Sequence, residues 1–125
     1  MAGKHPAGVG LDGCPGGWVS VARTASGHWH VTFVADLSAY LVALPGHTII
    51  GLDMPIGLMD AGGRDCDRLA RGLLGWPRSS SVFPAPIRPC LAAPDRGTAD
   101  RLQRAADGRG VGAQAFHIYA KVGEL

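Results

Sequence analysis

The chain has 125 residues, of which 46% are hydrophobic and 18% charged, and its formal net charge is +2 at pH 7. This length suits one domain with a hydrophobic core, and the composition excludes a disordered tail. No apolar run approaches the roughly 20 residues that a membrane-spanning helix needs, and no leader pattern is recognisable, so we expect a cytoplasmic protein without membrane contacts.

The first third of the sequence has the pattern of a β-meander. Alternating or continuous apolar residues predict strands over 9–12, 18–22 and 29–34. Turn-forming residues, Cys14-Pro-Gly-Gly and Thr24-Ala-Ser-Gly, separate these strands. We therefore predict three consecutive antiparallel strands.

A helix and a fourth strand follow the meander. Apolar residues at helical spacing predict a helix over 36–44, with Asp36 as its N-cap and Pro45-Gly46 as its end. The segment 48–53 is apolar on both faces, which is typical of an interior strand. A helical crossover favours parallel pairing of this strand with an earlier one, and the equally apolar first strand is the expected partner.

Both of these apolar strands end in Gly-Leu-Asp, at Asp12 and at Asp53. If the strands are parallel neighbours, the two aspartates emerge at the same carboxyl edge, where ligands bind open α/β sheets. Two nearby carboxylates repel each other unless a divalent cation lies between them, so the pair indicates a site for Mg²⁺ or Mn²⁺. The local alternative is that Asp12 forms an Asx turn and Asp53 caps the next segment.

The second half is less regular. We predict helices over 64–74 and 98–106, the latter capped by Thr98, and a proline-rich loop over 79–90 between them. Residues 114–125 have helical spacing but no C-cap. We expect one domain over 1–125 that is incomplete on its C-terminal side, with an open sheet edge through which the chain can associate with itself.

Several polar residues of this half have ordinary structural explanations. Asp67 and Arg71 are expected to form a surface ion pair along their helix. Ser80 and Ser81 can cap the loop or hydrogen-bond a phosphate, and Lys121 can belong to a terminal helix or contact a phosphate. Sequence spacing leaves these alternatives open.

Several stretches together resemble the motifs of the domain-of-unknown-function family 429, in the same order. They are GLDGCPGGWV at 10–19, GLDMPIGL at 51–58, RDCDRLAR at 64–71, SSVFPAP at 80–86 and QAFHIYAKV at 114–122. That family is grouped with ribonuclease-H-like folds and described as predicted nucleases. The resemblance therefore implies a ribonuclease-H-like α/β fold, of which this chain is similar to the N-terminal portion.

The chemistry of these residues and the resemblance together predict which side chains form the site. Asp12, Asp53 and Asp67 would be the catalytic acids, with Asp12 and Asp53 as ligands of Mg²⁺ or Mn²⁺. The substrate, a nucleic acid or another phosphoester, would be bound by Arg64, Arg68, Ser80, Ser81 and Lys121. The expected function is metal-dependent phosphodiester hydrolysis; the alternatives are an actin-like or sugar-kinase-like phosphotransferase and a non-catalytic phosphate- or nucleic-acid-binding module.

Overall fold

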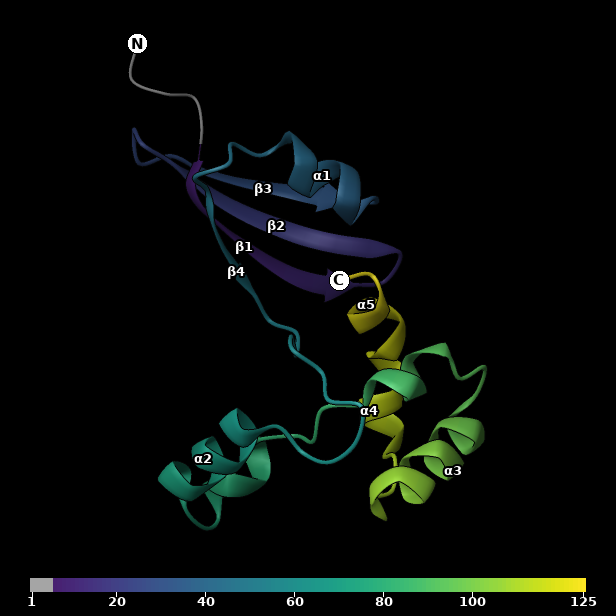
Figure 1. Cartoon of the computed structure of the whole chain (residues 1–125). Coiled ribbons are helices and arrows are strands. Elements are labelled where there is room, and N and C mark those ends of the chain that lie inside the picture. The colour runs from purple at the N-terminus through teal and green to yellow at the C-terminus, as the bar shows by residue number, and fades with distance from the viewer. Residues whose placement is uncertain (1–5) are drawn as a thin grey trace. The chain divides into compact units, whose positions relative to one another are not determined.

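The computed structural model describes residues 6–125, and within them the chain forms a mixed α/β structure (Figure 1). It divides into two compact units, the first formed by residues up to Met54 with Glu124 and the second by Pro55–Gly123 with Leu125. The predicted α/β class is confirmed, and the single partial domain stays a prediction. No helix among the described residues is long and apolar enough to cross a membrane.

The first unit contains the predicted meander. Its strands are β1 (Pro6–Cys14), β2 (Gly17–Thr24) and β3 (Trp29–Val34), paired antiparallel in chain order. The turn between β1 and β2 places Gly16 at φ 80°, a conformation that only glycine adopts without strain. β1 and β2 are longer than predicted because their pairing runs from Pro6 opposite Thr24 to Cys14 opposite Gly17.

Gly17, directly after that turn, is buried against β3. A Cβ at this position would press on the Val34 carbonyl oxygen and lie 2.8 Å from the Phe33 ring. We expect Gly17→Ala to lower the free energy of unfolding by about 1–3 kcal/mol, because the strands cannot separate without losing hydrogen bonds. Urea unfolding followed by near-ultraviolet circular dichroism measures the change. Gly46→Ala, whose Cβ would meet nothing within 4 Å, is the control, and equal stability of the two variants would contradict the clash.

Helix α1 (Leu37–Ala43) covers one face of the sheet. Asp36 caps it as predicted, with its Oδ1 accepting a hydrogen bond from the Ala39 amide at 2.9 Å. The core between helix and sheet is formed by buried apolar side chains of both, and it comprises Val9, Leu11, Trp18, Val34 and Leu37. Trp18 is therefore a core residue.

Strand β4 (Ile49–Leu52) pairs parallel with β1, which confirms the pairing expected from the crossover. The order of the sheet over the described residues is β3-β2-β1-β4 (Figure 1). The prediction of an interior strand is wrong for this part of the chain: β4 is an edge strand, and Ile49 is 76% exposed. An apolar run indicates that a strand can occupy an interior position. Whether it does depends on whether another strand pairs with its second edge.

The second unit is mainly helical. Its elements are the α-helices α2 (Asp65–Leu74), α3 (Arg96–Asp107), α4 (Ala113–His117) and α5 (Tyr119–Gly123) and the 3₁₀-helices η1 (Arg78–Ser81) and η2 (Arg88–Ala92). Its buried core gathers side chains from η2, α3 and α5 and the segments beside them, namely Ile87, Cys90, Ala99, Val111 and Tyr119.

Two boundaries in this unit differ from the prediction. The N-cap of α3 is Asp95, not Thr98: the Asp95 carboxylate accepts from the Thr98 amide at 2.7 Å, so the helix starts earlier. The expected helix over 114–125 is two short helices, which meet at Ile118. Both Asp and Thr can cap a helix, and the sequence offered no means to choose between them.

Candidate carboxylate site at the sheet edge

Asp12 and Asp53 lie in the first unit, at the carboxyl ends of β1 and β4. The last registered pair of these strands is Leu11 with Leu52, and the Asp53 amide donates to the Leu11 carbonyl at 3.3 Å. Both aspartates are exposed, and both line one pocket of about 690 Å³. The parallel pairing therefore brings the two Gly-Leu-Asp motifs together.

Strand alternation decides which face the aspartates share. Leu11 is buried under α1, so Asp12, one residue later, belongs to the opposite face of the sheet. On that face the residues two positions earlier are Gly10 and Gly51, which are opposite each other in the β1–β4 register. The carboxylates therefore stand beside a pair of positions without side chains.

These two glycines are not required by close backbone contacts. A Cβ at Gly10 would have the Val21 carbonyl oxygen as its nearest neighbour, at 3.8 Å, and one at Gly51 would meet the Val9 carbonyl oxygen at 3.9 Å. Both are ordinary van der Waals distances, so alanine would fit. Because neither glycine has a side chain, the sheet surface beside Asp12 and Asp53 is open, and we call this surface the glycine floor.

The donor set fits a hard divalent cation better than a zinc-type ion. Among residues 6–125, no group of three or more His, Cys, Asp or Glu side chains is placed to hold a metal. Mg²⁺, however, is commonly bound by one or two carboxylates, with waters and substrate phosphates completing its shell. Asp12 and Asp53, exposed at an open pocket, are the side chains that could supply such a partial shell.

Asp67 and Arg64 lie in the second unit and form a close ion pair. Arg64 Nη2 is 2.7 Å from Asp67 Oδ1, and Arg64 Nε is 3.0 Å from Oδ2, so the contact is bidentate. The hydrogen bonds to Asp67 raise the pKa of Arg64. Asp67 is only 8% exposed, and the remaining Arg64 nitrogen donates to the Ile56 carbonyl at 2.7 Å. The pair therefore fastens the start of α2 to the segment that follows β4.

The expected pair between Asp67 and Arg71 is wrong. Arg71 instead donates to the Val82 carbonyl, from Nη2 at 2.8 Å and from Nε at 3.1 Å. Asp67 takes the arginine three residues before it because Arg64, at the helix start, can approach both carboxylate oxygens. Helical spacing alone allows Asp67 to pair with either Arg64 or Arg71.

The remaining predicted site residues also belong to the second unit. Arg68 is exposed and pairs with Asp65 at 3.1 Å. Ser80 and Ser81 are exposed on η1, which packs against α2, and the Ser80 hydroxyl donates to the Pro77 carbonyl at 2.8 Å. Lys121 is half-buried on α5. Their assignment to a substrate site stays a prediction, as does the catalytic role of Asp67.

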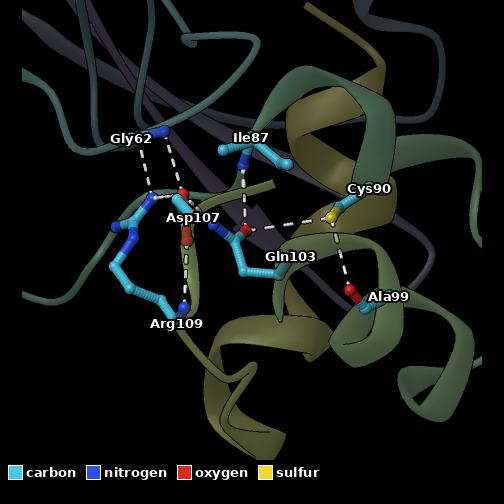
Figure 2. A network of polar contacts seen from close by, with 7 residues as sticks. All are labelled: Gly62, Ile87, Cys90, Ala99, Gln103, Asp107 and Arg109. Atoms are coloured by element: carbon cyan, nitrogen blue, oxygen red, sulfur yellow. Dashed lines mark hydrogen bonds and ion pairs between the residues drawn. The ribbon is translucent and has the colours of Figure 1, made fainter. Parts of the chain in front are cut away.

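Sequence reasoning missed a polar network around Asp107 at the end of α3 (Figure 2). Its Oδ2 accepts from the Gly62 amide at 2.9 Å, from Gln103 Nε2 at 2.7 Å and from Arg109 Nη2 at 2.8 Å, and its Oδ1 accepts from the Arg109 amide at 3.0 Å. The Arg109 guanidinium first, and then the other donors, holds the pKa of Asp107 far below its usual range. Only the spacing of Gln103 and Asp107 on one helix face hinted at this network.

The network continues into the core of the second unit. Gln103 Oε1 accepts from the Ile87 amide at 3.4 Å and faces Cys90 Sγ at 3.8 Å, while Cys90 Sγ is also 3.4 Å from the Ala99 carbonyl (Figure 2). Cys90 is fully buried, and burial raises the pKa of its thiol. A protonated, inaccessible thiol is not a nucleophile. The network is therefore a structural link between the loop at Gly62, η2 and α3.

Fold and site together define a mixed α/β protein whose parallel strand pair ends in two aspartates at an open pocket. The chain belongs to the family described as "Protein of unknown function (DUF429)", whose model matches residues 10–125. The expected family membership is thus confirmed. Neither a curated protein nor a solved structure gives a match.

Proposed function

We propose that this protein is a metal-dependent phosphodiesterase of ribonuclease-H-like architecture, with Asp12 and Asp53 as the ligands of Mg²⁺ or Mn²⁺. The observation that carries the proposal is the parallel pairing of β1 and β4, which brings both aspartates to one pocket. The order of antiparallel meander, helix and parallel strand is similar to the first half of a ribonuclease-H-like fold. Family membership is compatible with this function but does not name it.

The chemistry follows from the charges at the sheet edge. A divalent cation, when bound, would lower the pKa of a coordinated water and neutralise charge on a phosphoryl oxygen. Asp12 and Asp53 would hold it from two neighbouring strands, whose hydrogen bonds fix the spacing of the carboxylates. The open floor at Gly10 and Gly51 leaves room for a phosphate close to both side chains.

Metal binding gives the first test of this proposal. Mn²⁺ or Mg²⁺ should raise the thermal stability of the full chain, by about 2.7 kcal/mol when the free ion is at 100 times its dissociation constant. Asp12→Asn and Asp53→Asn should remove this effect while keeping the fold, because Asn has the same shape and no charge. Differential scanning fluorimetry with a metal titration measures it. ATP-dependent stabilisation would instead favour the phosphotransferase alternative.

A matched control is available in Asp60→Asn. Asp60 is an exposed aspartate of the second unit, 85% accessible, whose contact with Arg88 at 3.5 Å is too exposed to contribute much. The metal effect should persist in this variant. If the metal effect is unchanged in both Asp12→Asn and Asp53→Asn, these residues are not the ligands.

A further inference from the structure

A second pocket adjoins the aspartate pocket on the same side of the sheet. It has a volume of about 600 Å³, and residues of all four strands line it, among them Gly8, Gly10, Val21, Arg23, Trp29 and Ile49. Gly10 and Val21 also line the aspartate pocket. The two hollows therefore form one continuous surface, which we call the sheet groove.

The far end of the sheet groove carries an exposed indole beside a cation. Trp29 is 66% exposed, although tryptophan usually buries most of its surface. The Arg23 guanidinium carbon lies 5.5 Å from the centroid of the Trp29 ring, and the two residues are paired in the β2–β3 register. This cation–π contact keeps the indole in place and holds a positive charge next to it.

Further exposed apolar residues follow Trp29 along the same face of β3. Val31 is 71% exposed and Phe33 58% exposed, and strand alternation places both on the side of Trp29. Phe33 is opposite Val19, which in turn is opposite Asp12. Phe33 thus lies on the same face of the sheet at the level of Asp12, two strands away from it.

We propose that the sheet groove binds single-stranded nucleic acid, with one base stacked on Trp29 beside Arg23 and the backbone running over the glycine floor to Asp12 and Asp53. The inference rests on the proposed function, since it names the substrate of that same carboxylate site. A ring that stacks bases and a neighbouring cation for phosphate are the two features that single-strand binding surfaces combine. In a duplex the bases stack on one another, so a base free to stack on Trp29 belongs to a single strand.

The length of the groove also favours a strand over a mononucleotide. From the level of Trp29 and Arg23 to the level of Phe33 and Asp12 the strands advance by four residues, which is about 13 Å. A single nucleotide does not reach that far from its base to its phosphate. The base at Trp29 and the phosphodiester at the aspartates would therefore belong to different nucleotides of one strand.

The test measures binding without hydrolysis. In the full chain with Asp12→Asn and Asp53→Asn, in EDTA, neither cleavage nor metal contributes, and repulsion of phosphate by the carboxylates is removed. A short fluorescein-labelled oligothymidylate, followed by fluorescence anisotropy, is the probe. Because stacking on one aromatic ring contributes about 1–3 kcal/mol, Trp29→Ala should weaken binding about 5- to 150-fold.

Three further variants sharpen the comparison. Trp29→Phe should retain most of the affinity, because a phenyl ring still stacks. Arg23→Ala should weaken binding and reduce its salt dependence, because one phosphate contact is lost. Trp76→Ala is the matched control: Trp76 is 88% exposed but lies in the second unit, so its loss should leave binding unchanged.

The inference is overturned if the oligonucleotide does not bind, or if Trp29→Ala binds it as tightly as the background chain. Mn²⁺-dependent hydrolysis of bis(4-nitrophenyl) phosphate, measured with native aspartates, tests the proposed function separately, because this substrate has no base. Trp29-dependent binding without such hydrolysis would support the groove and reject the phosphodiesterase. Hydrolysis without Trp29-dependent binding would support the phosphodiesterase and reject binding of a single strand in the sheet groove.

Discussion

Replacing Asp53 by Asn is expected to reduce Mn²⁺-dependent phosphodiester hydrolysis by at least about 100-fold. Loss of a group that merely orients a metal ligand costs about 10- to 100-fold, and Asp53 is proposed as a ligand itself. Asp12→Asn should have an effect of similar size, because the two aspartates occupy equivalent ends of paired strands. Initial rates with bis(4-nitrophenyl) phosphate at saturating Mn²⁺ measure both.

The double variant distinguishes a shared site from two independent contributions. If Asp12 and Asp53 hold one ion, losing the second should add little to losing the first, since residues that act as a unit are strongly non-additive. Asp60→Asn should keep the native rate. Native activity in either single variant would remove that aspartate from the metal site.

Asp107→Ala is expected to destabilise the second unit by about 2–4 kcal/mol. Four hydrogen bonds converge on this carboxylate. Its removal leaves the Gly62 amide without its acceptor and the partly buried Arg109 guanidinium without its counter-charge, with only the Gly62 carbonyl, 2.8 Å from Arg109 Nη2, as a remaining acceptor among the described residues. The loop at Gly62 and the end of α3 should then open more often. Hydrogen exchange of residues 96–107, measured by mass spectrometry, should become faster in the variant.

Asp65→Ala is the control for this loss. Asp65 also pairs with an arginine, but both side chains are exposed, and such surface pairs contribute about 0–1 kcal/mol. Its exchange over residues 96–107 should match that of the native chain. If Asp107→Ala also exchanged like the native chain, the network in Figure 2 would not hold the second unit together.

The same network predicts how stability depends on pH. The pKa of Asp107 is lower in the folded chain than in the unfolded chain, where it is about 3.9, so its contribution is present above that value. The contribution is lost as the pH falls toward the folded pKa. The stability difference between the native chain and Asp107→Ala should therefore be largest near neutral pH and shrink below about pH 4.

Local patterns were sufficient to predict the framework of the first unit. Strand β3, the capping of α1 by Asp36 and the parallel pairing of β4 with β1 all follow from alternation, turn residues and the handedness of crossovers. That framework is also what brings Asp12 and Asp53 together. The common location of the two aspartates could be predicted because each directly follows the strand that positions it.

Features that depend on distant partners could not be predicted. Asp107 meets Gly62 across 45 residues of sequence, and no local pattern indicates that contact. Asp67 had two arginines at helical spacing, and the choice of Arg64 depends on the chain around Ile56. Trp29 is exposed because of the sheet face on which it lies. Strand alternation assigns Trp29 to that face only once the register of the strands is known.

The central claim is that Asp12 and Asp53 bind one divalent cation, and a crystal structure of the full chain grown with Mn²⁺ tests it most directly. Anomalous scattering from manganese locates the ion independently of any assumption about its ligands. We predict a peak in the pocket between β1 and β4, coordinated by an oxygen of Asp12 and an oxygen of Asp53. A fully occupied manganese site elsewhere in the chain, with the Asp12–Asp53 pocket empty, would contradict the claim.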